Sequence, residues 1–324
     1  MGRRLAASLS TLALAFAVAA CGGDPGAGGE NPSGLAGATA DGSSPAGDVP
    51  AFPVTVTGTS GDVEIAARPE RIVSLSPSAT EDLFAIGAGE QVVAVDDQSD
   101  FPTEAPTTGL SGFEPNIEAI AGYDPDLVVF ATETGDLGDS LGSLGITALH
   151  LDAPADLDGA FAQMQTLGIA TGHPDEASAL VSELRAEVEM ATAAADTYDG
   201  LSFYYELDDT YYSVTSETFI GQLFAMLGLE NIADAAKGAS SGYPQLSAEY
   251  IVESDPDLIF LADTECCGQS AETVARRPGW GDLSALAHGG VVELDDDVAS
   301  RWGPRVVDLL REIAGAASAV AEAT

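Results

Sequence analysis

Two similar stretches decide the fold class of this chain: DPDLVVFATE at residues 124–133 and DPDLIFLADT at residues 255–264. In each, Asp-Pro is followed by four apolar residues without alternation, which is typical of a strand buried on both faces of a parallel sheet. A residue before proline is disfavoured in a helix, so each first aspartate ends a helical segment. Glu118 and Glu249 precede the two stretches at the same offset. One copy alone could be an ordinary helix-to-strand turn, but the matched pair predicts two similar α/β lobes.

The N-terminus is typical of an export signal. It begins MGRRLAASLSTLALAFAVAAC, in which two arginines precede an apolar stretch too short for a transmembrane helix. The ending AVAAC resembles a lipobox, so we expect a lipoprotein signal peptide at 1–20 and lipidation of Cys21; ordinary signal cleavage is the alternative. Residues 21–51 are rich in Gly, Ala, Ser, Pro and Asp and predict a flexible tether. We therefore expect an extracytoplasmic protein, anchored to the outer face of the cell membrane.

The charge balance excludes one class of partner. The chain has 52 acidic residues against 11 basic ones, and its formal net charge is −41. Such a surface repels nucleic acid, so a nucleic-acid-binding function is excluded. The acidic residues are scattered, which favours a solvated folded surface over an acidic tail. Adaptation to a salty exterior is one hypothesis for this composition.

Alternating strand and helix patterns from Ile72 onward predict parallel sheets covered by helices. Between the two lobes, Pro174 begins a segment whose apolar residues recur at helical spacing, and Gly200 ends it. A single helix of that length is a stiff connector. The predicted divisions are an N-terminal lobe at 52–171, a connecting helix at 172–199 and a C-terminal lobe at 200–324.

Two cysteines follow Cys21, and they are neighbours: Cys266 and Cys267. Adjacent Cα atoms lie ~3.8 Å apart, which is shorter than in ordinary disulfides. A vicinal disulfide and a pair of free thiols both remain open from the sequence.

Several motifs, in this order and spacing, resemble the cobalamin and iron–siderophore family of ABC-importer substrate-binding proteins. They are RIVSLSPSATEDLFAIG at 71–87, SDFP at 99–102, the two DPDL strands, the connecting helix and SRWGPRVVDLL at 300–310. The resemblance implies two Rossmann-like lobes joined by a single long rigid helix, with a ligand cleft between the lobes. It also implies a binding protein without enzymatic activity or cofactor. Such a protein captures cobalamin, another corrinoid or a ferric siderophore, and delivers it to an ABC permease dimer with its ATPase subunits.

The resemblance assigns roles to particular residues. Glu118 and Glu249 correspond to exposed glutamates that dock onto basic residues of the permease dimer, although ordinary solvent-facing glutamates are common. Open α/β sheets bind ligands at the carboxyl ends of their strands, and flat aromatic rings suit a large planar chelate. The ligand candidates chosen on these grounds are Phe113, Tyr205, Tyr211, Tyr243, Asp297, Arg301 and Trp302.

The ligand itself stays open between cobalamin, a ferric siderophore and haem, in that order of preference. Many ferric siderophores are anionic, so an acidic protein would steer them poorly unless Arg276, Arg277 and Arg301 created a local positive field. Gln98, Trp302 and the cysteine pair depart from what the family resemblance implies.

Two other functions are weaker alternatives. A zinc- or manganese-binding transport protein would need converging histidines, and the chain has only His150, His173 and His288. A serine hydrolase would use Ser240 in GASSG, with Asp257 or Asp263 and then His288, but that motif needs a strand-to-helix elbow. No catalytic or metal-ligating set is predicted.

Overall fold

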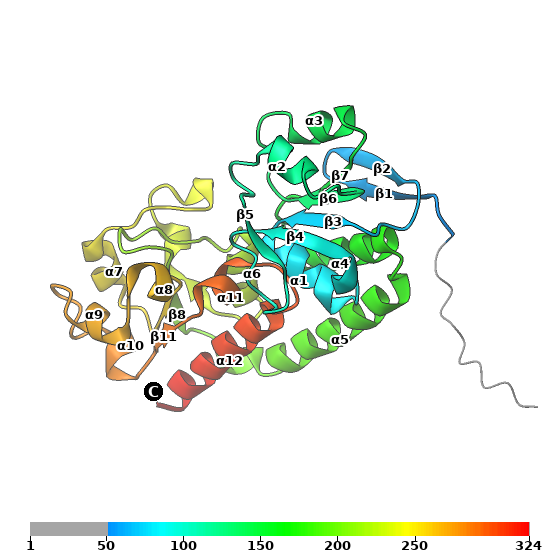
Figure 1. Ribbon diagram of the computed structural model, residues 1–324. Coiled ribbons are helices and arrows are strands. Elements are labelled where there is room, and N and C mark those ends of the chain that lie inside the picture. The colour runs from blue at the N-terminus through cyan, green and yellow to red at the C-terminus, as the bar shows by residue number, and fades with distance from the viewer. Residues whose placement is uncertain (1–50, 324) are drawn as a thin grey trace, which may run out of the picture. The chain divides into compact units, whose positions relative to one another are not determined.

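The computed structural model describes residues 51–323 (Figure 1). The predicted signal peptide, the lipidation site Cys21 and nearly all of the predicted tether lie outside the described residues. Within residues 51–323, no helix is both long enough and apolar enough to cross a membrane.

The N-terminal lobe is built on a five-stranded parallel sheet of order β5-β4-β3-β6-β7. An antiparallel hairpin of β1 and β2 precedes it. The strands are β1 (Val54–Gly58), β2 (Gly61–Ile65), β3 (Ile72–Leu75), β4 (Val92–Asp96), β5 (Thr107–Leu110), β6 (Leu127–Phe130) and β7 (Thr147–His150). The helices are α1 (Pro77–Ala85), α2 (Ile117–Ala121), α3 (Leu137–Ser143) and α4 (Leu157–Thr171), with a 3₁₀ turn η1 (Gly89–Gln91).

Helices cover both faces of this sheet. Leu127 and Val129 of β6 pack on one face with residues of α1 and α4. Val128 and Phe130 pack on the other face with residues of α2 and α3. All four β6 residues are buried, which confirms the interpretation of the uninterrupted apolar run as a strand covered on both sides.

The C-terminal lobe repeats this plan with a four-stranded parallel sheet of order β11-β10-β8-β9. Its strands are β8 (Ser202–Glu206), β9 (Glu230–Asn231), β10 (Leu258–Leu261) and β11 (Val291–Glu293). Its helices are α6 (Phe219–Ala225), α7 (Ala248–Ser254), α8 (Thr264–Cys267), α9 (Ala271–Ala275), α10 (Ser284–Ala287), α11 (Asp296–Ser300) and α12 (Val306–Ala323). Two 3₁₀ turns, η3 (Ile232–Ala235) and η4 (Ala239–Ser241), lie between α6 and α7.

The repeated DPDL motif has the same local geometry in both lobes. Asp124 and Asp255 adopt left-handed backbone conformations, with φ of 52° and 43°, and each turns the chain out of a helix before its proline. The next aspartate then aligns the new strand with the central strand. Asp126 accepts a bond from Arg71 N at 3.1 Å, and Asp257 accepts one from Ser202 N at 2.8 Å. The motif is therefore a helix-to-strand turn, used once in each of two similar lobes.

The connecting helix α5 (Pro174–Thr192) has 19 residues. It is shorter than the predicted segment 172–199 because the chain leaves the helix at Ala193 and forms a separate 3₁₀ turn η2 (Ala195–Thr197). Ala177 packs in the N-terminal core, whereas Val181 and Leu184 pack in the C-terminal core. One helix thus contributes to both cores, and α4 and α12 pack against it.

Candidate functional site

The carboxyl edges of the two sheets meet at the side chain of Arg301, which directly follows α11. Arg301 Nη1 lies 3.1 Å from Asp100 Oδ1 and 3.3 Å from Glu81 Oε1. Arg301 Nη2 donates to the carbonyl oxygen of Gln98 at 2.7 Å. Glu81 lies in α1, after β3, and the other two acceptors follow β4. The edge at which open α/β sheets bind ligands is therefore shared by both lobes.

Arg305 and Asp297 join these residues. We call the resulting set the interlobe cluster: Glu81, Asp100, Asp297, Arg301 and Arg305. Arg305 donates two hydrogen bonds to the carboxylate of Glu81, at 2.7 and 3.1 Å. Asp297 Oδ1 lies 2.6 Å from Arg301 Nη2. The side chain of Glu81 is only 1% exposed, and a carboxylate so deeply buried needs charged partners to offset its desolvation.

The cluster shifts the ionisation of its carboxylates. Burial raises the pKa of Asp297 to about 6, and the Arg301 charge opposes this rise only in part. Burial would also raise the pKa of Asp100, but the hydrogen bond and charge of Arg301 outweigh it and hold that pKa below its ordinary value.

Sequence reasoning missed Glu81, Asp100 and Arg305. The one available signal was the acidic pair Glu81–Asp82 in the middle of a helix that packs on a buried strand. No sequence pattern shows that their partners lie more than 200 residues away, since 220 positions separate Glu81 from Arg301.

Every arginine in residues 51–323 already has an acceptor or a partner within the protein. The local positive field that an anionic siderophore would require is opposed at Arg276 and Arg277, because Arg276 pairs with Glu272 and Arg277 makes a bidentate contact with Glu206 at 2.5 and 2.6 Å. The others are held by carboxylates, carbonyl oxygens or a histidine: Arg68, Arg71, Arg185, Arg301, Arg305 and Arg311. Lys237 is the remaining cationic side chain of the described part.

The predicted ligand residues fall into three groups. Phe113 and Tyr243 are 70% and 54% exposed, one on a loop of each lobe. Trp302, Asp297 and Tyr211 are half-buried. Tyr211 stacks on Trp280, with ring centroids 5.8 Å apart, and the backbone N–H of Trp302 donates to Ser78 across the two lobes at 3.1 Å.

Tyr205 and Arg301 form the third group, which is buried. Tyr205 is fully buried, and its hydroxyl donates to the carbonyl oxygen of Ala299 at 2.9 Å. It is a core residue, not a surface available to a ligand, because β8 is covered by helices on both faces. Arg301 is 8% exposed, and its guanidinium is already occupied by the interlobe cluster.

Glu118 and Glu249 occupy equivalent positions. Each is the second residue of a short helix, α2 or α7, capped by the side chain of Asn116 or Ser247. Both glutamates are exposed. Neither carboxylate has a hydrogen-bond or ion-pair partner within residues 51–323. A repeated acidic side chain is thus presented once on each lobe.

Cys266 and Cys267 are joined as a disulfide in the structure. They form the end of α8, which directly follows β10, and both side chains are exposed. The sequence left this pairing open, and the structure places it beside the carboxyl edge of the C-terminal sheet.

A second buried polar group lies in the C-terminal lobe, near the ends of β8 and β10. Asp263 is fully buried, and neither of its carboxylate oxygens has a hydrogen-bond partner in the described chain. Burial, with the Glu206 charge adding to it and the Arg277 charge opposing it, raises the pKa of Asp263 to about 7. From the sequence, Asp263 was considered only as a possible partner of Ser240 in a hydrolase, and its burial could not be predicted.

Ser240 does not have the geometry that a serine hydrolase requires. Ser240 lies in η4, a 3₁₀ turn flanked by Gly238 and Gly242 with φ of 93° and 79°, and no strand leads into it. Within the described range, no hydrogen bond joins Ser240 to His288.

The histidines do not converge either. His150 contacts Ser60 and Asp152, and His173 contacts Gln91 in the N-terminal lobe. Among residues 51–323, no group of three or more His, Cys, Asp or Glu side chains is arranged to hold a metal ion.

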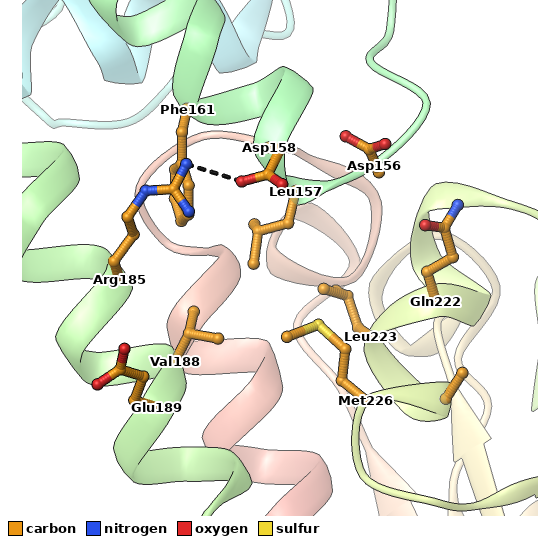
Figure 2. Close-up of a pocket in the computed structure, with 11 residues that line it drawn as sticks. Asp156, Leu157, Asp158, Phe161, Arg185, Val188, Glu189, Gln222, Leu223 and Met226 are labelled. Carbon is orange, nitrogen blue, oxygen red and sulfur yellow. Dashed lines mark ion pairs between the residues drawn. The ribbon is translucent and has the colours of Figure 1, made fainter.

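A cavity of about 650 Å³ lies between α4, α5 and α6 (Figure 2). Two of the residues that line it form an ion pair, in which Arg185 Nη2 lies 2.7 Å from Asp158 Oδ1. None of the predicted ligand residues lines this cavity, so we do not assign the ligand to it.

Comparison with known proteins agrees with this architecture. Residues 72–298 match the model of the periplasmic binding protein family. A cobalamin-binding protein of Halobacterium salinarum is 34% identical over 275 residues, covering 82% of this chain and 74% of the relative. An uncharacterised ABC transporter substrate-binding lipoprotein of Bacillus subtilis is 29% identical over 274 residues, covering 81% and 85%.

Solved structures show the same fold. A periplasmic vitamin B12-binding protein of Vibrio cholerae superposes with a TM-score of 0.64 at 23% identity, over 79% of this chain and 99% of that one. A periplasmic haem-binding protein of Roseiflexus gives a TM-score of 0.67 at 25% identity, over 78% and 99%. The family match, the parallel sheets of both lobes and these superpositions agree. This chain therefore belongs to the periplasmic binding protein family.

Proposed function

We propose that this protein captures a cobalt corrinoid outside the cytoplasm and delivers it to an ABC permease dimer with its ATPase subunits. One observation supports the ligand class most directly: the arginines at the shared carboxyl edge are already neutralised by carboxylates of the protein. Anionic siderophores and haem propionates would need an unpaired cation there. A corrinoid, which is large and roughly neutral to cationic, needs aromatic and polar surface instead.

The name of one relative and two exposed aromatic side chains support the same ligand. The Halobacterium relative is named a cobalamin-binding protein. Phe113 and Tyr243 offer exposed aromatic rings from opposite lobes. We propose that these rings contact the bound chelate, with Trp302, Asp297 and Tyr211 nearby. The buried Arg301 supports the site indirectly, by holding residues of both lobes together in the interlobe cluster.

The ligand is tested by isothermal calorimetry of the purified protein with three chelates: cyanocobalamin, an anionic ferric catecholate siderophore and haem. We expect saturable binding of cyanocobalamin at micromolar or lower concentration, and at least about tenfold weaker binding of the other two. Preferential binding of the siderophore or haem would move the ligand to iron and leave the fold and transport role in place.

We further propose that Glu118 and Glu249 dock the loaded protein onto basic residues of the permease. Their equivalent positions, exposure and lack of partners support this role, because a binder with two similar lobes needs one acidic contact per lobe on a two-fold receptor. The double variant E118K/E249K should bind ligand normally and lose uptake in a reconstituted transporter.

A matched control is E183K/E230K, which makes the same charge change at two other exposed glutamates whose carboxylates have no hydrogen-bond or ion-pair partner within residues 51–323. Its uptake should stay near the native rate. Equal loss of uptake in both double variants would show that net charge matters and that the docking assignment is wrong.

The cell-surface anchor is a separate proposal. The short apolar leader and the AVAAC sequence support lipidation of Cys21, and the Bacillus relative is named a lipoprotein. The variant C21S should leave the membrane fraction and appear in the soluble fraction. Retention of C21S on the membrane would contradict lipid anchoring through this cysteine.

A further inference from the structure

The Cys266–Cys267 disulfide is a feature that ligand capture and docking leave unused. It forms the last two residues of the four-residue helix α8, and both side chains are exposed. Exposed disulfides are open to attack by thiolates from solution, whereas buried ones are protected. The pair is therefore accessible to a small reductant without any opening of the protein.

The first three backbone N–H groups of the helix that carries the disulfide share one carboxylate acceptor. Asp296 accepts hydrogen bonds from the backbone N–H groups of Thr264 at 2.8 Å and Cys266 at 2.9 Å, and from that of Glu265 at 3.2 Å. A helix this short is not stable by its own hydrogen bonds, because the unfavourable first turn is most of it. Its N-terminal end is held by Asp296 and by the Thr264 hydroxyl, which donates to the carbonyl oxygen of Leu294 at 2.7 Å, and its other end carries the disulfide ring.

Asp296 also connects α8 to the contact between the lobes. It is the first residue of α11, which packs against α8 and ends directly before Arg301. Arg301 in turn holds Glu81 and Asp100 of the N-terminal lobe. The short helix α11 thus lies between Asp296, which anchors α8, and Arg301 of the interlobe cluster.

We propose that Cys266–Cys267 is a redox-responsive site, whose reduction by a dithiol loosens α8 from Asp296 and weakens the interlobe cluster through α11. One thiolate of the reductant attacks a cysteine sulfur and forms a mixed disulfide. Its second thiolate resolves that bond. Two electrons and two protons pass from the dithiol to Cys266 and Cys267, which become thiols, and the reductant leaves as a disulfide. Opening the ring returns backbone freedom to half of α8.

The test is hydrogen–deuterium exchange on the full chain, with the oxidation state of the 264–277 peptide checked by mass spectrometry. Protein purified without reductant is compared with protein treated with dithiothreitol, which is then removed under argon. We expect exchange in α8 to become at least about tenfold faster on reduction. Segments 296–302, 78–82 and 98–101 should become several-fold faster, whereas α2, distant in sequence and in the other lobe, should not change.

Two variants separate the loss of the disulfide from the loosening of α8 from Asp296. C266A/C267A should match the reduced protein with or without dithiothreitol. D296N, in the oxidised protein, should loosen α8 and α11 while the disulfide stays intact. Unchanged exchange in α2 and in the buried strand β8 of the C-terminal lobe shows that each variant remains folded.

Three results would overturn the proposal: free thiols at both positions in the protein purified without reductant, unchanged exchange in α8 after reduction, or faster exchange in α8 without a change in segment 296–302. None of these readouts involves a ligand. The redox proposal and the transport proposal therefore fail independently.

Discussion

The variant E81Q tests whether the interlobe cluster stabilises the folded protein. Glu81 is the shared acceptor of Arg301 and Arg305, which come from the other lobe. Glutamine keeps the shape and part of the hydrogen bonding but removes the charge. Arg301 retains Asp100 and Asp297. Arg305 retains its contact with the ring of Phe101, 4.2 Å from the ring centroid, and the weaker influence of the Asp295 and Asp297 charges.

The expected cost follows from burial. Removing one partner of a buried ion pair costs about 3–5 kcal/mol when the remaining charge has no other partner. The Arg305 side chain is 17% exposed and Arg301 keeps two carboxylates, so we expect a loss of about 2–3 kcal/mol in the free energy of unfolding. For a chain of this size, that loss lowers Tm by roughly 4–6 °C.

The assay is urea and thermal unfolding of E81Q beside E272Q. Glu272 pairs with Arg276 on the surface, where both side chains are at least 70% exposed, and loss of such a pair costs about 0.5 kcal/mol or less. If E81Q unfolds within about 0.5 kcal/mol of the native protein, the reasoning about the interlobe cluster is refuted.

Three further predictions concern pH, salt and ligand contact. The folded-state pKa of Asp263 is raised to about 7, so the native protein should lose stability relative to D263N as pH rises from about 4 to 7, by up to about 4 kcal/mol. Urea unfolding of both proteins at pH 4.5 and 7.5 checks this. An equal difference in their free energies of unfolding at the two pH values would contradict it. Because the net charge is −41, NaCl should raise Tm by screening self-repulsion, and an unchanged Tm would argue against adaptation to salt. F113A and Y243A should each weaken cyanocobalamin binding by roughly threefold to tenfold with Tm unchanged, whereas unaltered calorimetric affinity would remove these rings from the site.

The strands were predictable because burial on both faces leaves a run of apolar residues with no competing pattern. The run Leu127–Phe130 and its copy in the second lobe both became inner strands of their sheets. The turn before each was also predictable, since a residue before proline is disfavoured in a helix. The end of α5 was not, because Ala193 and its neighbours have good helix propensity and only tertiary packing decides where the helix stops.

The candidate site was less predictable, because side-chain orientation and partners depend on contacts distant in sequence. Arg301 was predicted as a ligand residue, but its guanidinium is held by Glu81 and Asp100 of the other lobe. Tyr205 and Tyr243 look alike in sequence. One lies inside a covered strand and the other on an exposed loop. Which of 52 acidic residues would meet a given arginine is decided by the fold alone.

The most direct test of corrinoid capture at the shared carboxyl edge is a fluorescence titration with cyanocobalamin, in which the native protein is compared with W302F. Trp280 is fully buried in the C-terminal core, whereas Trp302 is half-buried beside the interlobe contact. We predict saturable quenching at micromolar or lower concentration, with most of the amplitude lost in W302F and the calorimetric affinity of that variant within about tenfold of native. The absence of saturable quenching, together with no calorimetric signal, would contradict the corrinoid assignment.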